Sequence, residues 1–80
     1  MGPTPYQYLP LWAKVAIERL DADAQLRSEA MLDELIASYA RSYGDSVDEH
    51  TRESARHICR RRFVGSYTEP ALLEPVPPGT

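Results

Sequence analysis

Five arginines lie on one expected helix, four of them in its second half, and they are the side chains with the clearest capacity for chemistry. Arg52, Arg56 and Arg60 recur every four residues. Arg61 and Arg62 follow directly, and no acidic residue lies between positions 54 and 68. Guanidinium groups bind carboxylates and phosphates through paired hydrogen bonds. The cluster therefore indicates an acidic protein surface or a phosphate backbone as a partner, but it identifies no reaction.

The same arginines also have a purely structural interpretation. Glu53 precedes Arg56 by three residues, a spacing at which opposite charges support a helix. The last three arginines have no acid within helical reach, yet cations near a helix C-terminus are stabilising by themselves. Both interpretations stay open at this point. The expected partner-binding residues of the cluster are Arg56, Arg60, Arg61 and Arg62.

Metal and nucleophilic chemistry have few candidates in this chain. His50, His57 and Cys59 are the soft ligands on offer, but a helix would not bring all three together, and zinc needs three or four convergent ligands. A nucleophile would need a base held by a third group, and the four glycines are isolated, so no phosphate-binding loop is present. We expect no metal, no cofactor, no small-molecule substrate and no enzymatic activity from this chain alone.

A DNA-binding helix-turn-helix is the main alternative for the arginines. Helix, glycine turn and helix follow in order around Gly44, and Ala40 supplies the small residue that the turn needs. However, His50 and Glu53 fall where the second helix should bury aliphatic side chains. Acids in that helix would also face phosphates. The turn resembles the motif, whereas the second helix departs from it.

Length and composition indicate one small domain. The chain has 80 residues, a formal net charge of −3 and 42% hydrophobic residues. A chain this short buries only about 60% of its unfolded surface. The single cysteine, Cys59, suits a reducing compartment. Without a membrane-length apolar run or a signal-peptide pattern, the sequence predicts a cytoplasmic protein.

Periodicity predicts a small all-α fold, a bundle of three helices with extended proline-rich N- and C-terminal segments. The expected helices are Pro10–Leu20, Ala24–Tyr43, and a third from the capping box Ser46–Glu49 to Phe63 or Val64. A further capping box is expected over Thr4–Gln7, and Gly44 is expected to end the second helix. The predicted domain is 1–67. Residues 68–80 hold four prolines and form an extended tail whose Leu72, Leu73 and Val76 could dock on the bundle or on a partner.

The first helix is apolar around most of its circumference, and two neighbouring helices can hardly cover it. Tyr8, Leu11 and Trp12 are therefore expected at an apolar contact surface, covered by a protein partner or a second copy. The sequence predicts a regulatory, inhibitory or assembly protein that acts on a larger protein. Nucleic-acid binding through the arginines is the alternative, and a small stabilising subunit of an enzyme complex is a further one.

Overall fold

Three α-helices build the described part of the chain, as the periodicity predicts. A computed structural model describes residues 2–68. The first helix, α1, spans Leu11–Ala22 and follows a short 3-10 turn, η1, at Tyr6–Tyr8. Pro10 opens α1, because its carbonyl accepts hydrogen bonds from the backbone N–H groups of Ala13 and Lys14. The predicted tail lies outside the described residues, apart from Thr68.

The capping box expected over Thr4–Gln7 does not form. Pro5 precedes η1, and no side chain caps that turn. Thr4 is engaged elsewhere, since its backbone N–H donates to Ser54 Oγ at 2.8 Å and its hydroxyl lies 2.8 Å from His50 Nε2. The residue therefore ties the N-terminal segment to the third helix instead of starting a helix.

The second predicted helix is divided at Ser28. A 3-10 turn, η2 (Ala24–Leu26), is capped by Asp23, and α2 then spans Glu29–Ser42 with Ser28 as its N-cap. Ser28 is extended, with φ −146°, because the chain here pairs with Thr68 in an isolated parallel β-bridge. That pairing interrupts the helical run. At the other end Gly44 adopts φ +73°, which confirms the predicted stop.

The third helix, α3, spans Glu49–Arg62 and begins later than predicted. Its N-cap is Asp48, whose carboxylate accepts from the backbone N–H and the hydroxyl of Thr51 at 3.0 and 2.7 Å. The capping box from Ser46 is thus wrong. Val47 instead packs against the core, which keeps the preceding segment out of the helix. The helix ends before Gly65, where φ is +87°.

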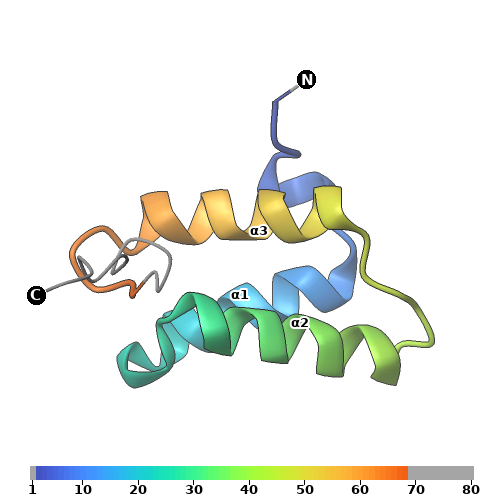
Figure 1. Cartoon of the computed structure of the whole chain (residues 1–80), viewed down its shortest axis with the longest axis horizontal. Coiled ribbons are helices and arrows are strands. Elements are labelled where there is room, and N and C mark those ends of the chain that lie inside the picture. Colours follow the sequence, from blue (N-terminus) through green and yellow to red (C-terminus); the bar gives the residue numbers. More distant parts are fainter. Residues whose placement is uncertain (1, 69–80) are drawn as a thin grey trace, which may run out of the picture.

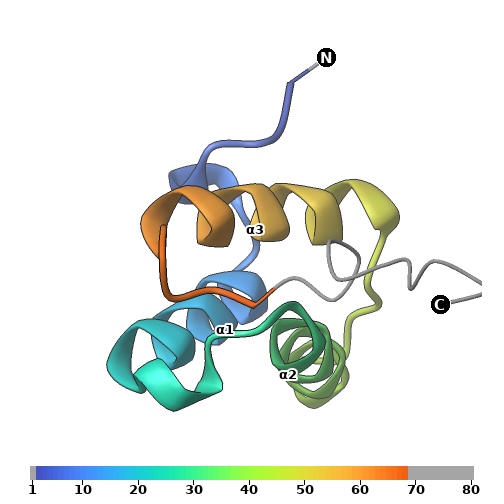
Figure 2. The same ribbon diagram turned by 60° about the vertical axis from the view of Figure 1, so that its left-hand side comes forward.

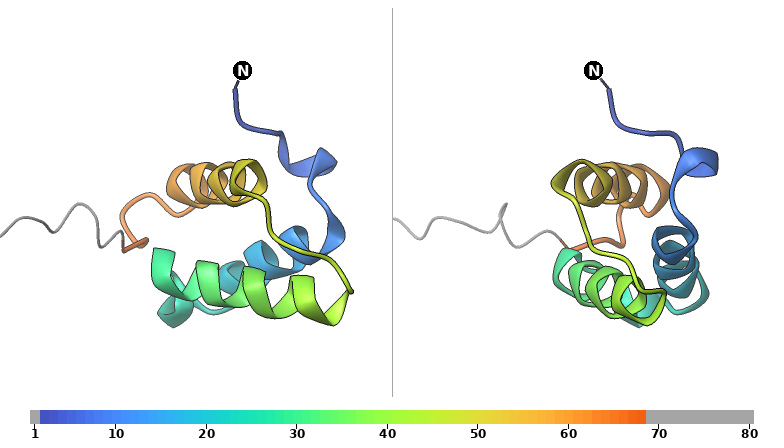
Figure 3. Two further views of the ribbon diagram at one scale, coloured as in Figure 1. Left: turned by 45° about the vertical axis from the view of Figure 1, so that its right-hand side comes forward. Right: turned by 90° about the vertical axis from the view of Figure 1, so that its right-hand side faces the viewer.

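Helices α1 and α2 lie side by side and antiparallel, and α3 lies above the pair in the view of Figure 1. When the molecule is turned, α2 is seen almost end-on while α3 still runs across the view (Figure 2). The N-terminal segment, with η1, folds over the first half of α3 (Figure 3). Within residues 2–68, no helix is both long and apolar enough to span a bilayer.

The core forms where the three helices meet, and α1 contributes most to it. The small residues Ser54, Ala55 and Cys59 bring α3 close to the other helices. Because these side chains bury little apolar area, α3 gains less from the hydrophobic effect than α1 and α2 do. The buried apolar residues are Leu9, Trp12, Ala13, Ala16, Ile17, Leu20, Leu32, Ile36, Ala40, Ala55, Cys59 and Phe63.

Candidate interaction surfaces

Arg56 is the centre of an ion-pair network that joins α3 to α2. Its Nη2 lies 2.9 Å from Asp33 Oδ2 and its Nη1 lies 2.7 Å from Glu53 Oε2. Its Nε lies 3.3 Å from Glu29 Oε2, an ion pair without the alignment of a hydrogen bond. The hydrogen bond to Asp33 is the main cause of a raised Arg56 pKa. The side chain is only 17% exposed, so its charge interacts mainly with carboxylates of the same chain and little with solvent.

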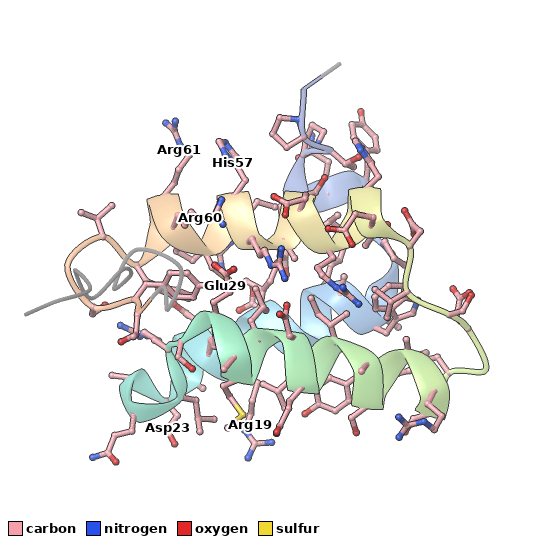
Figure 4. The ribbon with its side chains drawn as sticks, in the orientation of Figure 1. Arg19, Asp23, Glu29, His57, Arg60 and Arg61 are labelled. Carbon is pink, nitrogen blue, oxygen red and sulfur yellow. The ribbon has the colours of Figure 1, made fainter. Side chains whose placement is uncertain are left out.

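Two further arginines join α3 to the rest of the bundle. Arg60 points toward α2, where its Nη2 lies 3.2 Å from Glu29 Oε1 (Figure 4). Arg62 reaches α1, with its Nη1 3.1 Å from Glu18 Oε2. The Arg62 guanidinium also lies over the Tyr6 ring, 5.0 Å from its centroid. Because α3 buries little apolar area, these polar contacts add to what holds it against the other helices.

The acids that hold these arginines were missed by the sequence analysis. Arg60 and Arg62 have no acidic neighbour on their own helix, but Glu29, Asp33 and Glu18 approach from α2 and α1. Glu29 and Asp33 are four residues apart and so share one side of α2. This spacing matches that of Arg56 and Arg60, and it is the feature of the sequence that could have predicted the pairing of the two helices. The structure therefore supports the structural interpretation for Arg56, Arg60 and Arg62.

Arg61 differs from its neighbours. It is exposed and points away from the bundle beside His57 (Figure 4). Within the described part of the chain, no hydrogen bond or ion pair explains the outward orientation of either side chain. Of the four arginines expected to bind a partner, Arg61 is the one whose charge is fully presented to solvent.

Trp12 lies in the core, which corrects its expected place on a contact surface. Its side chain is 3% exposed, and its indole N–H donates to Asp45 Oδ2 at 2.9 Å. That bond, followed by one from the Ser46 backbone N–H, lowers the Asp45 pKa. Helix α1 is covered more completely than expected because Leu9 and the N-terminal segment add to the cover from α2 and α3. A second copy is not needed to bury Trp12.

The start of α1 and the end of α2 lie at one end of the bundle (Figure 3), and the segments there carry large exposed apolar side chains. Tyr8 is 72%, Leu11 58% and Tyr43 50% exposed. We call these three residues the apolar end. The Trp12–Asp45 hydrogen bond links the two segments that carry them. Tyr8 and Leu11 were expected at a contact surface, whereas Tyr43 was not among the residues expected there.

The candidate metal ligands do not converge. His50 contacts Thr4, His57 faces outward, and Cys59 is buried in the core. Burial raises the pKa of the Cys59 thiol to about 12, which keeps it protonated and weakly nucleophilic. Among residues 2–68 no three His, Cys, Asp or Glu side chains are arranged to hold a metal, and no pocket is found there.

The chain matches no protein-family profile, no curated protein and no solved structure at a significant level. Its function is accordingly inferred from the residues and their geometry.

Proposed function

We propose that this protein is a non-enzymatic interaction module, a regulatory, inhibitory or assembly protein that binds a larger protein through the apolar end. The observation that carries the proposal is the exposure of Tyr8, Leu11 and Tyr43 on segments joined at one end of the bundle. Scattered exposed apolar residues are normal on proteins. Tyrosine is enriched at interface centres, which makes Tyr8 and Tyr43 the residues of this end best suited to contact a partner.

The apolar end is held in place before any partner arrives. The side chain of Trp12, next to Leu11, is buried in the core, and its hydrogen bond to Asp45 fixes the segment that follows Tyr43. A preorganised surface loses less conformational entropy on binding, so more of the contact energy appears as affinity. Tyrosine adds an advantage, since its rigid ring offers a large contact area and its hydroxyl a hydrogen bond.

Nucleic-acid binding receives less support from the arrangement of the arginines. Phosphate binding depends on cations that are free to displace counterions. Arg56, Arg60 and Arg62 are instead paired with carboxylates of the same chain. Glu53 also lies on α3 and is exposed, where it would repel a phosphate backbone. Titration with duplex DNA and with RNA at two salt concentrations tests this alternative, and tight binding that weakens steeply with salt would favour it.

Affinity capture from native extract tests the proposed function. The immobilised variants are Tyr8→Ser/Tyr43→Ser, which removes both rings of the apolar end, and Val64→Ser, which removes an exposed apolar side chain after α3. We expect the wild type and Val64→Ser to retain the same protein and the double variant to lose it. Equal capture by all three would contradict the proposal. Circular dichroism of each variant confirms that the fold is kept.

The partner could also be a second copy of the chain. Sedimentation over a range of concentrations distinguishes the two cases, because self-association depends on concentration without any added protein. Association that disappears in Tyr8→Ser/Tyr43→Ser would assign the apolar end to a homo-oligomer. A monomer at all concentrations would leave a different protein as the partner.

A further inference from the structure

Residues 2–8, which we call the N-terminal arm, are attached to the bundle mainly by polar contacts. Within the arm only Thr4 and Tyr6 are partly buried, and the other residues are exposed. Leu9, which follows the arm, is 5% exposed and belongs to the core. Burial of apolar area is the main stabilising force in folding. It therefore holds the chain from Leu9 onward, but within the arm it acts through little more than the Tyr6 ring.

The first attachment joins the arm to α3 at Thr4. The Thr4 backbone N–H donates to Ser54 Oγ at 2.8 Å, and the Thr4 hydroxyl lies 2.8 Å from His50 Nε2. Ser54 is fully buried, so the arm is part of what shields it from water. Among residues 2–68, no backbone hydrogen bond joins the arm to another helix, because those of the arm stay within the 3-10 turn η1. Water can replace such side-chain bonds when the arm moves away.

The second attachment joins the arm to α1 and α3 together at Tyr6. The Tyr6 hydroxyl donates to Glu18 Oε2 at 2.7 Å, and Arg62 Nη1 lies 3.1 Å from the same oxygen. The Arg62 guanidinium and the Lys14 ammonium both lie over the Tyr6 ring, 5.0 and 5.8 Å from its centroid. The hydrogen bonds from Tyr6 and Arg62 lower the pKa of Glu18, so this contact favours the ionised carboxylate. Glu18 thus connects the arm with two helices.

These attachments differ in kind from those of the three helices. The Glu18 side chain is 51% exposed and that of Arg62 33%, so solvent weakens their pairing. Segments with few buried apolar contacts open on their own, whereas the core opens only with the whole fold. Leu9 marks the boundary, since its side chain stays in the core and its backbone is extended, with φ −73° and ψ 153°.

We propose that the N-terminal arm is a lid, held closed by Tyr6 on Glu18, which opens as a unit while the three helices stay folded. Opening exposes Ser54 to solvent, and closing covers it again. The arm carries Tyr8, so the apolar end is complete only while the lid is closed. This last consequence rests on the proposed function, and it means that the closed fraction of molecules sets the apparent affinity for a partner.

Hydrogen exchange of the free, full-length chain tests the lid, with NMR detection at several denaturant concentrations. The Thr4 amide reports on the lid, and the amides of Ile17 and Ile36 report on the bundle. Opening of the lid exposes little surface, so we expect Thr4 to exchange faster than both isoleucines and with little dependence on denaturant. Exchange of Thr4 at the rate and denaturant dependence of Ile17 and Ile36 would overturn the proposal. Exchange at the rate of an unstructured peptide would also overturn it, because the lid would then not be held closed.

Two tyrosine variants test how the lid is held. Tyr6→Phe keeps the ring and removes the hydroxyl that bonds Glu18, so exchange at Thr4 should rise about two- to ten-fold, as for one lost hydrogen bond, and exchange at Ile17 should not change. The matched control is Tyr39→Phe, which removes a hydroxyl that accepts from Arg19 Nη1 at 3.4 Å between α2 and α1.

The control should leave exchange at Thr4 unchanged. No effect of Tyr6→Phe at Thr4, or an equal effect of both variants there, would overturn the proposal. An equal rise at Thr4 and Ile17 in Tyr6→Phe would do the same, because it would assign the hydroxyl to the stability of the whole bundle. The measurements need no partner, so their failure would leave the proposed function to be judged by affinity capture alone.

Discussion

Replacement of Arg56 by alanine should destabilise the protein strongly, although the residue is an arginine near the surface. The change removes ion pairs to Asp33, Glu53 and Glu29 and leaves the last of these, a mostly buried carboxylate, with one fewer cation. Breaking a fully buried ion pair costs about 3–5 kcal/mol, whereas an exposed pair contributes about 0.2–1 kcal/mol. Arg56 lies between these cases, with a side chain 17% exposed.

The expected loss is therefore about 2 kcal/mol. For a domain of this size, each kcal/mol lowers the melting temperature by about 4–8 °C, so the transition should fall by about 8–16 °C. The assay is thermal unfolding followed by circular dichroism, with Arg61→Ala as the matched control. That control has the same chemistry on the same helix, but its side chain is exposed, and surface substitutions of this kind stay within about 0.5 kcal/mol.

Equal melting temperatures for Arg56→Ala and Arg61→Ala would refute the reasoning. They would mean that the ion pairs of Arg56 contribute no more to folding than a solvated charge does. Helix propensity does not confuse the comparison, because both substitutions replace arginine with alanine within α3.

Three further predictions follow from the core and its hydrogen bonds. Ile17→Ala should cost about 2–5 kcal/mol in denaturant unfolding, because the side chain is fully buried; a loss below about 1 kcal/mol would contradict the packing described. The Asp45 pKa is lowered in the folded state, so the stability gained from its ionised form is present at neutral pH and is lost as the pH falls through that pKa. Asp45→Asn should therefore melt below wild type at pH 7, and the two curves should converge in acid; a difference that persists there would assign the effect to something other than charge. Cys59 in the native protein should resist a thiol reagent at pH 8 and react once the chain is unfolded, and rapid native labelling would show that it is accessible.

The three helices were predictable because their apolar periodicity is local. Their beginnings were less so. Helix α2 begins after Ser28 and not at Ala24, and α3 is capped by Asp48 and not by Ser46. Ser28 is extended because Thr68 pairs there, and Asp48 caps because Val47 is held against the core. Both contacts involve parts of the chain that are distant in sequence, so the local sequence around each cap does not predict them.

The ion pairs were beyond a local analysis for a related reason. Arg56 and Asp33 are 23 residues apart, and Arg62 and Glu18 are 44 apart. Their meeting depends on how α3 crosses the other helices. Before that crossing is known, all four arginines look available to a partner. Within residues 2–68, Arg61 is the one of the four for which no ion pair to a carboxylate is found.

Tyr8, Leu11 and Trp12 were expected on one surface, and the structure exposes two of the three. Tyr8 and Leu11 are exposed, but Trp12 is buried in the core and donates its indole N–H to Asp45. Tyr43 continues the apolar period of α2, yet it is the C-cap residue after the last helical position and is half exposed. Periodicity predicts which side of a helix faces inward, but not how far along the helix its neighbours reach.

Hydrogen exchange of the chain with and without its captured partner tests the central claim most directly. If the apolar end is the contact surface, the partner should slow exchange at the amides around Tyr8–Leu11 and Tyr43–Asp45, and leave the outer side of α3 unchanged. Protection confined to the residues around His57 and Arg61, with the apolar end unaffected, would contradict the claim and assign the contact to the exposed basic side of α3.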